Sequence, residues 1–171
     1  MSPTLTAPAG TSWFALRVRS RSEIMVSQLL EAKGYQSYSP SYTSDRQYSD
    51  RIKRVEAALF PGYVFCRFAP GEILPIVSTP AVQHVVGIGA HPQPIDDQEI
   101  ERIQTGVLYG QAVAPHPYLH TGQRVRVRSG ALAGIEGFLV QMRNNHRLVI
   151  SADILQRAVS LQIDARHVVA I

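Results

Sequence analysis

A change in hydrophobic periodicity near residue 110 constrains the fold of this chain more than any other feature. Before it, short apolar runs such as Trp13–Val18 alternate with two helix-start signals of the form S/D-x-x-E, which begin at Ser20 and Asp96. After residue 120, apolar and polar residues alternate strictly, as in Arg124–Arg128 and Val159–Ile163. We therefore predict an α+β domain followed by a small all-β domain.

The N-terminal pattern predicts a mostly antiparallel sheet with flanking helices. Strands are expected at 13–18, 35–43, 52–57, 59–68 and 82–88, a short helix at 72–78, and a longer helix after each capping box. The stretch 111–120 contains two prolines and has no amphipathic period, which is typical of a linker. The predicted organisation is a flexible tail at 1–12, a domain at 13–110, a linker at 111–120 and a small barrel at 121–171.

Composition argues against several classes of protein. The chain has a single cysteine, Cys66, and six scattered histidines, so neither an internal disulfide nor a Cys/His zinc site is expected. No apolar run approaches the ~18 residues of a membrane span. The first dozen residues lack the features of a signal peptide. Sequence patterns of hydrolases, P-loops and dinucleotide-binding folds are absent. We expect a cytoplasmic, monomeric binding protein with no catalytic residues, no cofactor and no metal.

Charge is distributed unevenly along the chain. Residues 17–67 contain nine Lys/Arg and five Asp/Glu, for a net charge of +4. Residues 68–110 contain one arginine and five acidic residues, for −4. Residues 121–171 contain seven arginines and three acidic residues, again for +4. Two basic regions flanking an acidic one are compatible with a polyanionic partner such as nucleic acid, and equally with solvated surfaces.

Three motifs in order resemble one family. They are WFALRVRSRSE, SDRIKRVEAALFPGYVFCRF and GQRVRVRSGALAGIEGFLV. Together they resemble the NusG family of transcription elongation factors, in which an N-terminal NGN domain precedes a C-terminal KOW domain that forms a five-stranded SH3-like barrel. The SDRIK segment ahead of LFPGYVF is similar to the specialised UpxY and RfaH-like antiterminators. The resemblance extends from Trp13 to Ile171.

The resemblance implies a protein that binds the clamp helices of the RNA polymerase largest subunit and promotes processive elongation and antitermination. Phe60, Pro61, Tyr63 and Phe65 fall on the family segment that contacts these helices. Exposed aromatic side chains on a rigid strand would serve as anchors. In the alternative interpretation, Tyr63 and Phe65 fill the core. We expect Phe60 and Tyr63 to lie nearer the surface than Phe65.

Two basic segments resemble family contacts with the non-template DNA strand. The first contains Arg17, Arg19 and Arg21, which we expect to point to one side until the helix begins, where Arg21 diverges. The second is a tyrosine-rich hairpin that carries Arg46, Tyr48, Arg51, Lys53 and Arg54. A solvated hairpin face is an equally good interpretation. Glu72–Pro75 departs from the His/Thr-rich stretch of RfaH-like proteins, so their second polymerase contact is not expected here.

The KOW-like segment implies docking to a small-subunit ribosomal protein or to the termination factor Rho. Leu132, Ile135 and Phe138 would form the contact, although residue 132 is often aromatic in the family. The row Arg124, Arg126 and Arg128 would bind RNA or simply face solvent. An alternative function is therefore a KOW-type RNA-binding or ribosome-associated protein.

Overall fold

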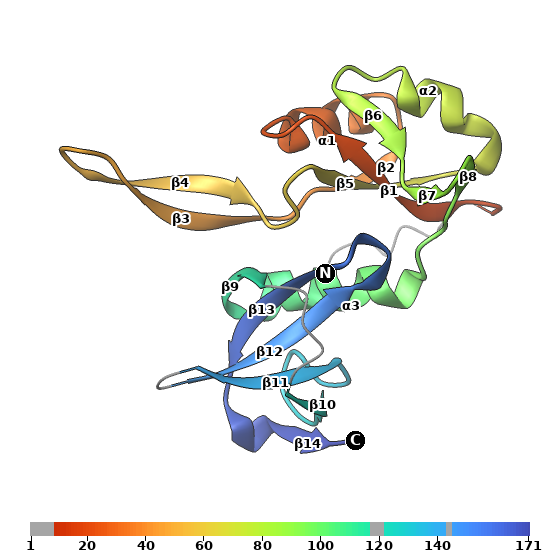
Figure 1. The fold of residues 1–171 in the computed structure, drawn as a ribbon. Coiled ribbons are helices and arrows are strands. Elements are labelled where there is room, and N and C mark those ends of the chain that lie inside the picture. The colour runs from red at the N-terminus through yellow and green to blue at the C-terminus, as the bar shows by residue number, and fades with distance from the viewer. Residues whose placement is uncertain (1–8, 117–121, 143–144) are drawn as a thin grey trace. The chain divides into compact units, whose positions relative to one another are not determined.

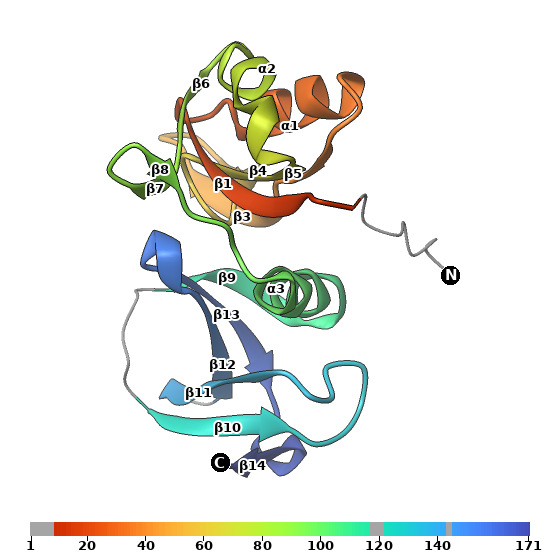
Figure 2. The ribbon, with the colours of Figure 1, turned by 90° about the vertical axis from the view of Figure 1, so that its right-hand side faces the viewer.

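The computed structural model describes residues 9–116, 122–142 and 145–171, and the chain divides into two compact units (Figures 1 and 2). Unit 1 consists of Met1–Ser39 and Gly62–Asp97, and unit 2 of Pro40–Pro61 and Gln98–Ile171. The C-terminal unit thus begins upstream of the predicted boundary at residue 110. None of the helices in the described residues has the length and apolarity that crossing a membrane requires.

Unit 1 is built on a four-stranded antiparallel sheet in the order β2-β5-β1-β6. Its strands are β1 (Ser12–Val18), β2 (Gln36–Tyr38), β5 (Tyr63–Phe68) and β6 (Val82–Val85). The helices are α1 (Glu23–Ala32), the 3-10 turn η1 (Pro70–Glu72) and α2 (Ile73–Val77). A two-stranded ribbon follows, formed by β7 (Gly87–Ile88) and β8 (His91–Pro92). This arrangement confirms the predicted α+β architecture.

The core of unit 1 lies between one face of this sheet and the two helices. Phe14 and Leu16 of β1 alternate with residues on the opposite face, and they pack against Val26 of α1 and Ile76 of α2. Cys66 belongs to the same cluster, and burial raises the pKa of its thiol to about 12. The thiol is therefore protonated near neutral pH, as expected of a small core residue.

Several predicted boundaries are wrong: the strand expected at 59–68 begins at Tyr63, and the strand expected at 82–88 is divided into β6 and β7. Helix α1 begins at Glu23, with Ser22 at its N-cap, and Ser20 does not cap it. The Glu23 side chain instead turns inward and accepts a hydrogen bond from the Gly62 amide, so a tertiary contact overrides the local capping pattern. The strand predicted at 35–43 is broken at Pro40, which has no N–H to donate to a sheet.

Unit 2 contains an exposed hairpin and a six-stranded sheet. The hairpin pairs β3 (Ser41–Gln47) with β4 (Ile52–Ala58). The sheet has the order β14-β10-β11-β12-β13-β9, with every neighbouring pair antiparallel. Its strands are β9 (Gln111–His116), β10 (Gln123–Val127), β11 (Glu136–Met142), β12 (Asn145–Ala152), β13 (Arg157–Ile163) and β14 (Val168–Ala170). Two 3-10 turns, η2 (Asp153–Leu155) and η3 (Ala165–His167), interrupt it. The predicted all-β C-terminal region is confirmed.

The predicted linker is not free chain over 111–116, because these residues form β9 along the edge of β13. The Arg147 guanidinium joins the two strands: it donates to the Ser160 hydroxyl and carbonyl at 2.8 Å each and to the Ala112 carbonyl. Residues 117–120 lie outside the described part of the chain.

Helix α3 (Asp97–Tyr109) also packs on this sheet. A Cβ atom at Gly106 would lie 2.8 Å from Ile150 and 3.3 Å from Leu161, so the absence of a side chain permits the close approach. The Glu99 carboxylate accepts a hydrogen bond from the Asp153 amide at 2.9 Å. Both α3 and β9 are thus fastened to the sheet of unit 2.

Candidate functional site

The Pro61–Gly62 turn leads into β5 and is fixed on both sides of the Gly62 peptide. The Gly62 amide donates to the buried Glu23 carboxylate at 2.7 Å, and the Gly62 carbonyl accepts from the Val18 amide at 2.9 Å. Gly62 has a φ of 82°, a conformation that favours glycine. The residues on each side of it are therefore held in a defined orientation.

Arg17 and Tyr63 form a pair beside this turn. They lie opposite each other in the β1–β5 register, and the Arg17 guanidinium carbon lies 5.0 Å from the centroid of the Tyr63 ring. Both side chains are half-buried and lie on the sheet face opposite Leu16 and Val18, which belong to the core. This geometry is a cation–π contact. The sequence analysis expected Tyr63 to contact the polymerase and Arg17 to contact the non-template DNA strand, whereas the structure places the two side chains against each other.

The four predicted polymerase contacts around the F-P-G-Y segment are not equally accessible. Pro61 is exposed, Tyr63 is half-buried and Phe65 is completely buried. Phe60 is only 1% exposed, so the prediction that it lies near the surface is wrong. Phe65 stacks on Tyr38 with a centroid distance of 6.3 Å, and burial raises the pKa of the Tyr38 hydroxyl. Pro61 and Tyr63 are thus the two members of the segment that a partner can reach.

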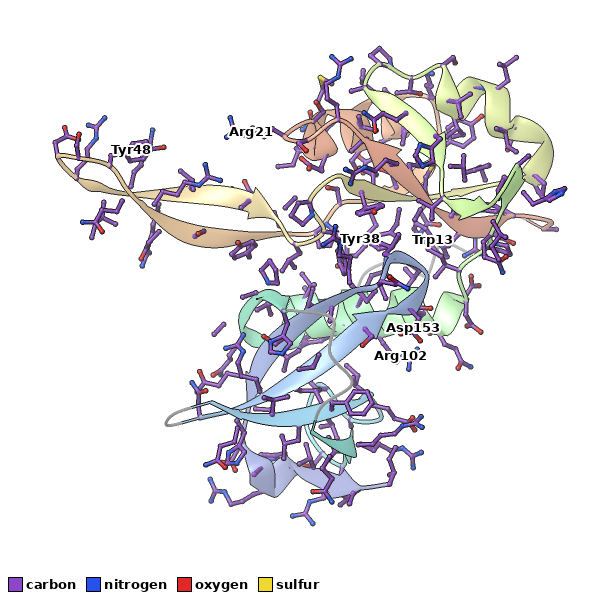
Figure 3. The ribbon with its side chains drawn as sticks, viewed as in Figure 1. Trp13, Arg21, Tyr38, Tyr48, Arg102 and Asp153 are labelled. Carbon is purple, nitrogen blue, oxygen red and sulfur yellow. The ribbon has the colours of Figure 1, made fainter. Side chains whose placement is uncertain are left out.

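Arg19 and Arg21 are exposed but do not continue the row of Arg17. Strand β1 ends at Val18, and the Arg19 amide donates to the Ala81 carbonyl at 2.9 Å. Arg21 has a φ of 67° in the turn before α1 (Figure 3). Strand alternation therefore does not apply beyond Val18 and does not set the side on which Arg19 lies, while Arg21 lies in the turn where we expected it to diverge.

The hairpin separates its basic residues onto two faces. Arg46 lies opposite Lys53, and directly opposed residues of an antiparallel pair share a face. Arg54 lies opposite Asp45 on the other face and forms an ion pair with it at 3.5 Å. The hairpin face of Arg46 and Lys53 continues toward a tip that is closed by a hydrogen bond from the Tyr48 amide to the Arg51 carbonyl. Tyr48 is 48% exposed (Figure 3).

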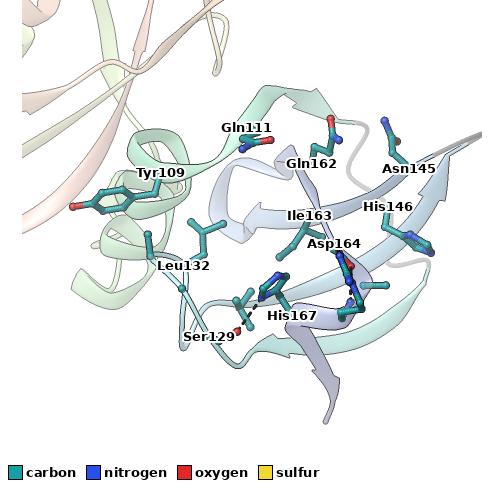
Figure 4. Close-up of a pocket in the computed structure, with 15 residues that line it drawn as sticks. Tyr109, Gln111, Ser129, Leu132, Asn145, His146, Gln162, Ile163, Asp164 and His167 are labelled. Atoms are coloured by element: carbon teal, nitrogen blue, oxygen red, sulfur yellow. Dashed lines mark hydrogen bonds and ion pairs between the residues drawn. The ribbon is translucent and has the colours of Figure 1, made fainter.

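The three predicted contact residues of the KOW-like segment do not form one surface. Leu132 lines a pocket of 660 Å³ together with Ser129 and His167, which share a hydrogen bond of 3.0 Å (Figure 4). Ile135 is buried, with 4% of its surface exposed. Phe138 lines a second hollow of 230 Å³ that also contains Arg102 of α3. Among the three, Leu132 is the member that opens onto the larger pocket.

Two arginines of the β10 row share one carboxylate. Arg124 and Arg126 both bind the Glu136 carboxylate, at 3.3 Å and 2.5 Å. The hydrogen bond from Arg126 is the main cause that lowers the pKa of Glu136. Arg128 is exposed at the end of the row. One carboxylate shared by two of the three arginines leaves the row with a net positive charge, so RNA binding and a solvated face remain alternative predictions for it.

The sequence predicts that the chain holds no metal ion. Within the described residues, no group of three or more His, Cys, Asp or Glu side chains could hold one. Sequence reasoning missed two structural roles: that of Glu23 at the Gly62 turn and that of Arg147 in the sheet of unit 2. Glu23 carried a signal but was assigned to capping, and Arg147 carried none, because its contacts with Ala112 and Ser160 depend on strand pairing.

Comparison with known proteins gives consistent results. The family model described as "Transcription termination factor nusG" matches residues 11–104. A "Transcription termination/antitermination protein NusG" from Lactococcus lactis is 31% identical over 135 residues, covering 75% of this chain and 71% of the relative. A protein of the same name from Helicobacter pylori is 24% identical over 173 residues, covering 88% of this chain and 93% of the relative.

A solved structure shares the fold. Its description reads "Domain interaction in Thermotoga maritima NusG", and it superimposes with a TM-score of 0.55 at 20% sequence identity. The match covers 94% of this chain and 97% of that one.

Proposed function

The chain belongs to the NusG family of transcription termination and antitermination factors, and on that premise we propose that it binds the clamp helices of RNA polymerase through the Pro61–Tyr63 turn. The family is one of transcription factors, so the chain is not an enzyme. The observation that carries the proposal is the combination of accessibility and rigidity at this turn. Pro61 is exposed and Tyr63 half-exposed, while Glu23 and Val18 hold the peptide between them. A rigid aromatic anchor contributes contact area at little entropic cost.

Binding of this kind would act on the polymerase by population shift. A protein that binds the closed clamp more tightly than the open clamp stabilises the closed state, and the shift equals the difference in the two binding free energies. A closed clamp favours continued elongation over pausing. The proposed activity is therefore processive elongation and antitermination in the cytoplasm. The SDRIK…LFPGYVF motif supports a specialised paralogue dedicated to particular operons.

The hairpin supports a contact with the non-template DNA strand. Arg46 and Lys53 share one exposed face, and Tyr48 near the tip offers a ring on which a base can stack. Arg54 is excluded from this surface because it lies on the opposite face with Asp45. For the C-terminal unit, the pocket lined by Leu132 is the proposed contact with a ribosomal protein or Rho.

The Tyr63→Ala variant tests the polymerase contact. Loss of a central aromatic anchor should weaken binding to an RNA polymerase clamp-helix fragment by about 1–2 kcal/mol, or roughly five- to thirtyfold in Kd. Tyr109→Ala is the matched control, because Tyr109 is also exposed but lies at the end of α3. Equal affinity of a folded Tyr63→Ala variant and the wild type would refute the proposed contact.

A further inference from the structure

Arg17 is a half-buried cation whose donors remain available. Its guanidinium lies over the Tyr63 ring, and no ion pair to it occurs within the described residues. Stacking on an aromatic face uses the plane of the guanidinium and leaves its five N–H groups free to donate. His84 of β6 lies opposite Arg17 in the sheet and adds no negative charge. The pair therefore offers hydrogen-bond donors with no acidic group of its own to receive them.

The position of this cation is set by the same turn that orients Tyr63. A Cβ atom at Gly62 would lie 2.9 Å from the guanidinium carbon of Arg17, so the guanidinium occupies the space that glycine leaves open. Glu23 fixes Gly62 from the other side through the Gly62 amide. Arg17 and Tyr63 thus form one preorganised unit, and Glu23 is a positioning residue for it.

We propose that Arg17 and Tyr63 act as a single recognition pair that binds a carboxylate side chain next to an apolar side chain on the protein partner. This inference rests on the proposed contact between Tyr63 and the polymerase. Planar guanidinium groups match carboxylates in a two-point geometry, and Tyr63 supplies the apolar surface beside them. Because Arg17 is stacked on Tyr63, it must meet the same partner as Tyr63. The exposed Arg19 and Arg21 remain for DNA phosphates.

The test compares single variants of the full chain against the clamp-helix fragment. Arg17→Ala should raise Kd about tenfold or more, because the charge-assisted hydrogen bonds to the partner carboxylate are lost. Arg17→Lys should fall between Arg17→Ala and the wild type, because it keeps the charge but loses the planar fork. Arg19→Ala is the matched control and should leave this affinity unchanged. Thermal unfolding of each variant checks that it is folded.

The outcomes separate this inference from the function on which it rests. If Arg17→Ala binds the fragment like the wild type but loses crosslinking to non-template DNA in a stalled complex, Arg17 is a phosphate contact and the inference is overturned. If Tyr63→Ala weakens binding and Arg17→Ala does not, the inference alone fails. If neither variant changes affinity, the polymerase contact itself is wrong.

The role of Glu23 has its own readout. Glu23→Gln retains a side-chain oxygen that can accept from the Gly62 amide, whereas Glu23→Ala does not. We expect amide exchange at Gly62 to accelerate in Glu23→Ala and to stay near the wild-type rate in Glu23→Gln, with fragment affinity following the same order. Equal exchange rates and equal affinities for Glu23→Ala and the wild type would show that Glu23 does not position the turn.

Discussion

Substitution of Gly62 by alanine should destabilise unit 1 through two effects that can be separated. The first is backbone strain, because a φ of 82° is left-handed and costs a non-glycine residue about 1–2 kcal/mol. The second is displacement of Arg17, whose guanidinium carbon would lie 2.9 Å from the new methyl group. Loss of the cation–π contact with Tyr63 adds about 0.5–1 kcal/mol. The expected total is ~1.5–3 kcal/mol.

Gly34→Ala is the matched control for the first effect. Gly34 has a φ of 90°, and a Cβ atom there would meet nothing within 4 Å, so this variant reports backbone strain alone. Both glycines belong to unit 1, and so does Trp13, the only tryptophan of the chain. Trp13 is 4% exposed, and its fluorescence should change when unit 1 unfolds in urea.

The displacement of Arg17 is measured by the difference in unfolding free energy between the two glycine variants. Gly62→Ala should lower the free energy of unfolding by about 0.5–1 kcal/mol more than Gly34→Ala does. This excess should vanish when both variants are made in an Arg17→Ala background, because no guanidinium is then displaced. Equal destabilisation by the two variants in the wild-type background would mean that Arg17 does not lie against Gly62, and the recognition pair would lose its structural basis.

Three further predictions concern unit 2. Arg147→Ala should destabilise the sheet by about 1–3 kcal/mol and accelerate amide exchange along β9, since its hydrogen bonds join β9 to β13. Burial is the main cause that lowers the pKa of His116 below 6.5, and Arg147 adds to it, so the folded state favours the neutral imidazole. Because the unfolded chain takes up the proton more readily, β9 should lose stability as the pH falls below 6.5. In an amide-exchange titration, His116→Gln should abolish this pH dependence. Arg46→Ala should reduce the salt slope of single-stranded DNA binding by about 0.7. Arg54→Ala should change that slope less, because Arg54 is paired with Asp45.

Local patterns in the sequence predicted much of unit 1. The apolar run Trp13–Val18 correctly indicated the first strand, and Cys66 within the aromatic strand predicted at 59–68 is buried, as a small core residue would be. These features depend on side-chain period and composition, which are visible in a single strand. The short helix expected at 72–78 forms as α2 despite Pro75, because this proline lies in the first turn of the helix, where a missing N–H is tolerated.

Features that depend on pairing between distant segments were not predictable. Residues 111–116 contain a proline and no amphipathic period. They form a strand because they pair with the edge of β13 and because Arg147 donates a hydrogen bond to the Ala112 carbonyl. The separation of Arg54 from Arg46 follows from the β3–β4 register, which composition does not reveal. The burial of Phe60 and the inward turn of Glu23 are likewise set by tertiary contacts.

Site-specific photocrosslinking tests the central claim most directly. A photoreactive phenylalanine analogue placed at residue 63 in the full chain would be activated in a stalled elongation complex, with the same analogue at residue 109 as control. The proposed contact predicts a crosslink from residue 63 to the clamp helices of the polymerase largest subunit and none from residue 109. A crosslink from residue 63 that maps only to DNA or to another subunit, or that is no stronger than the control, would contradict it.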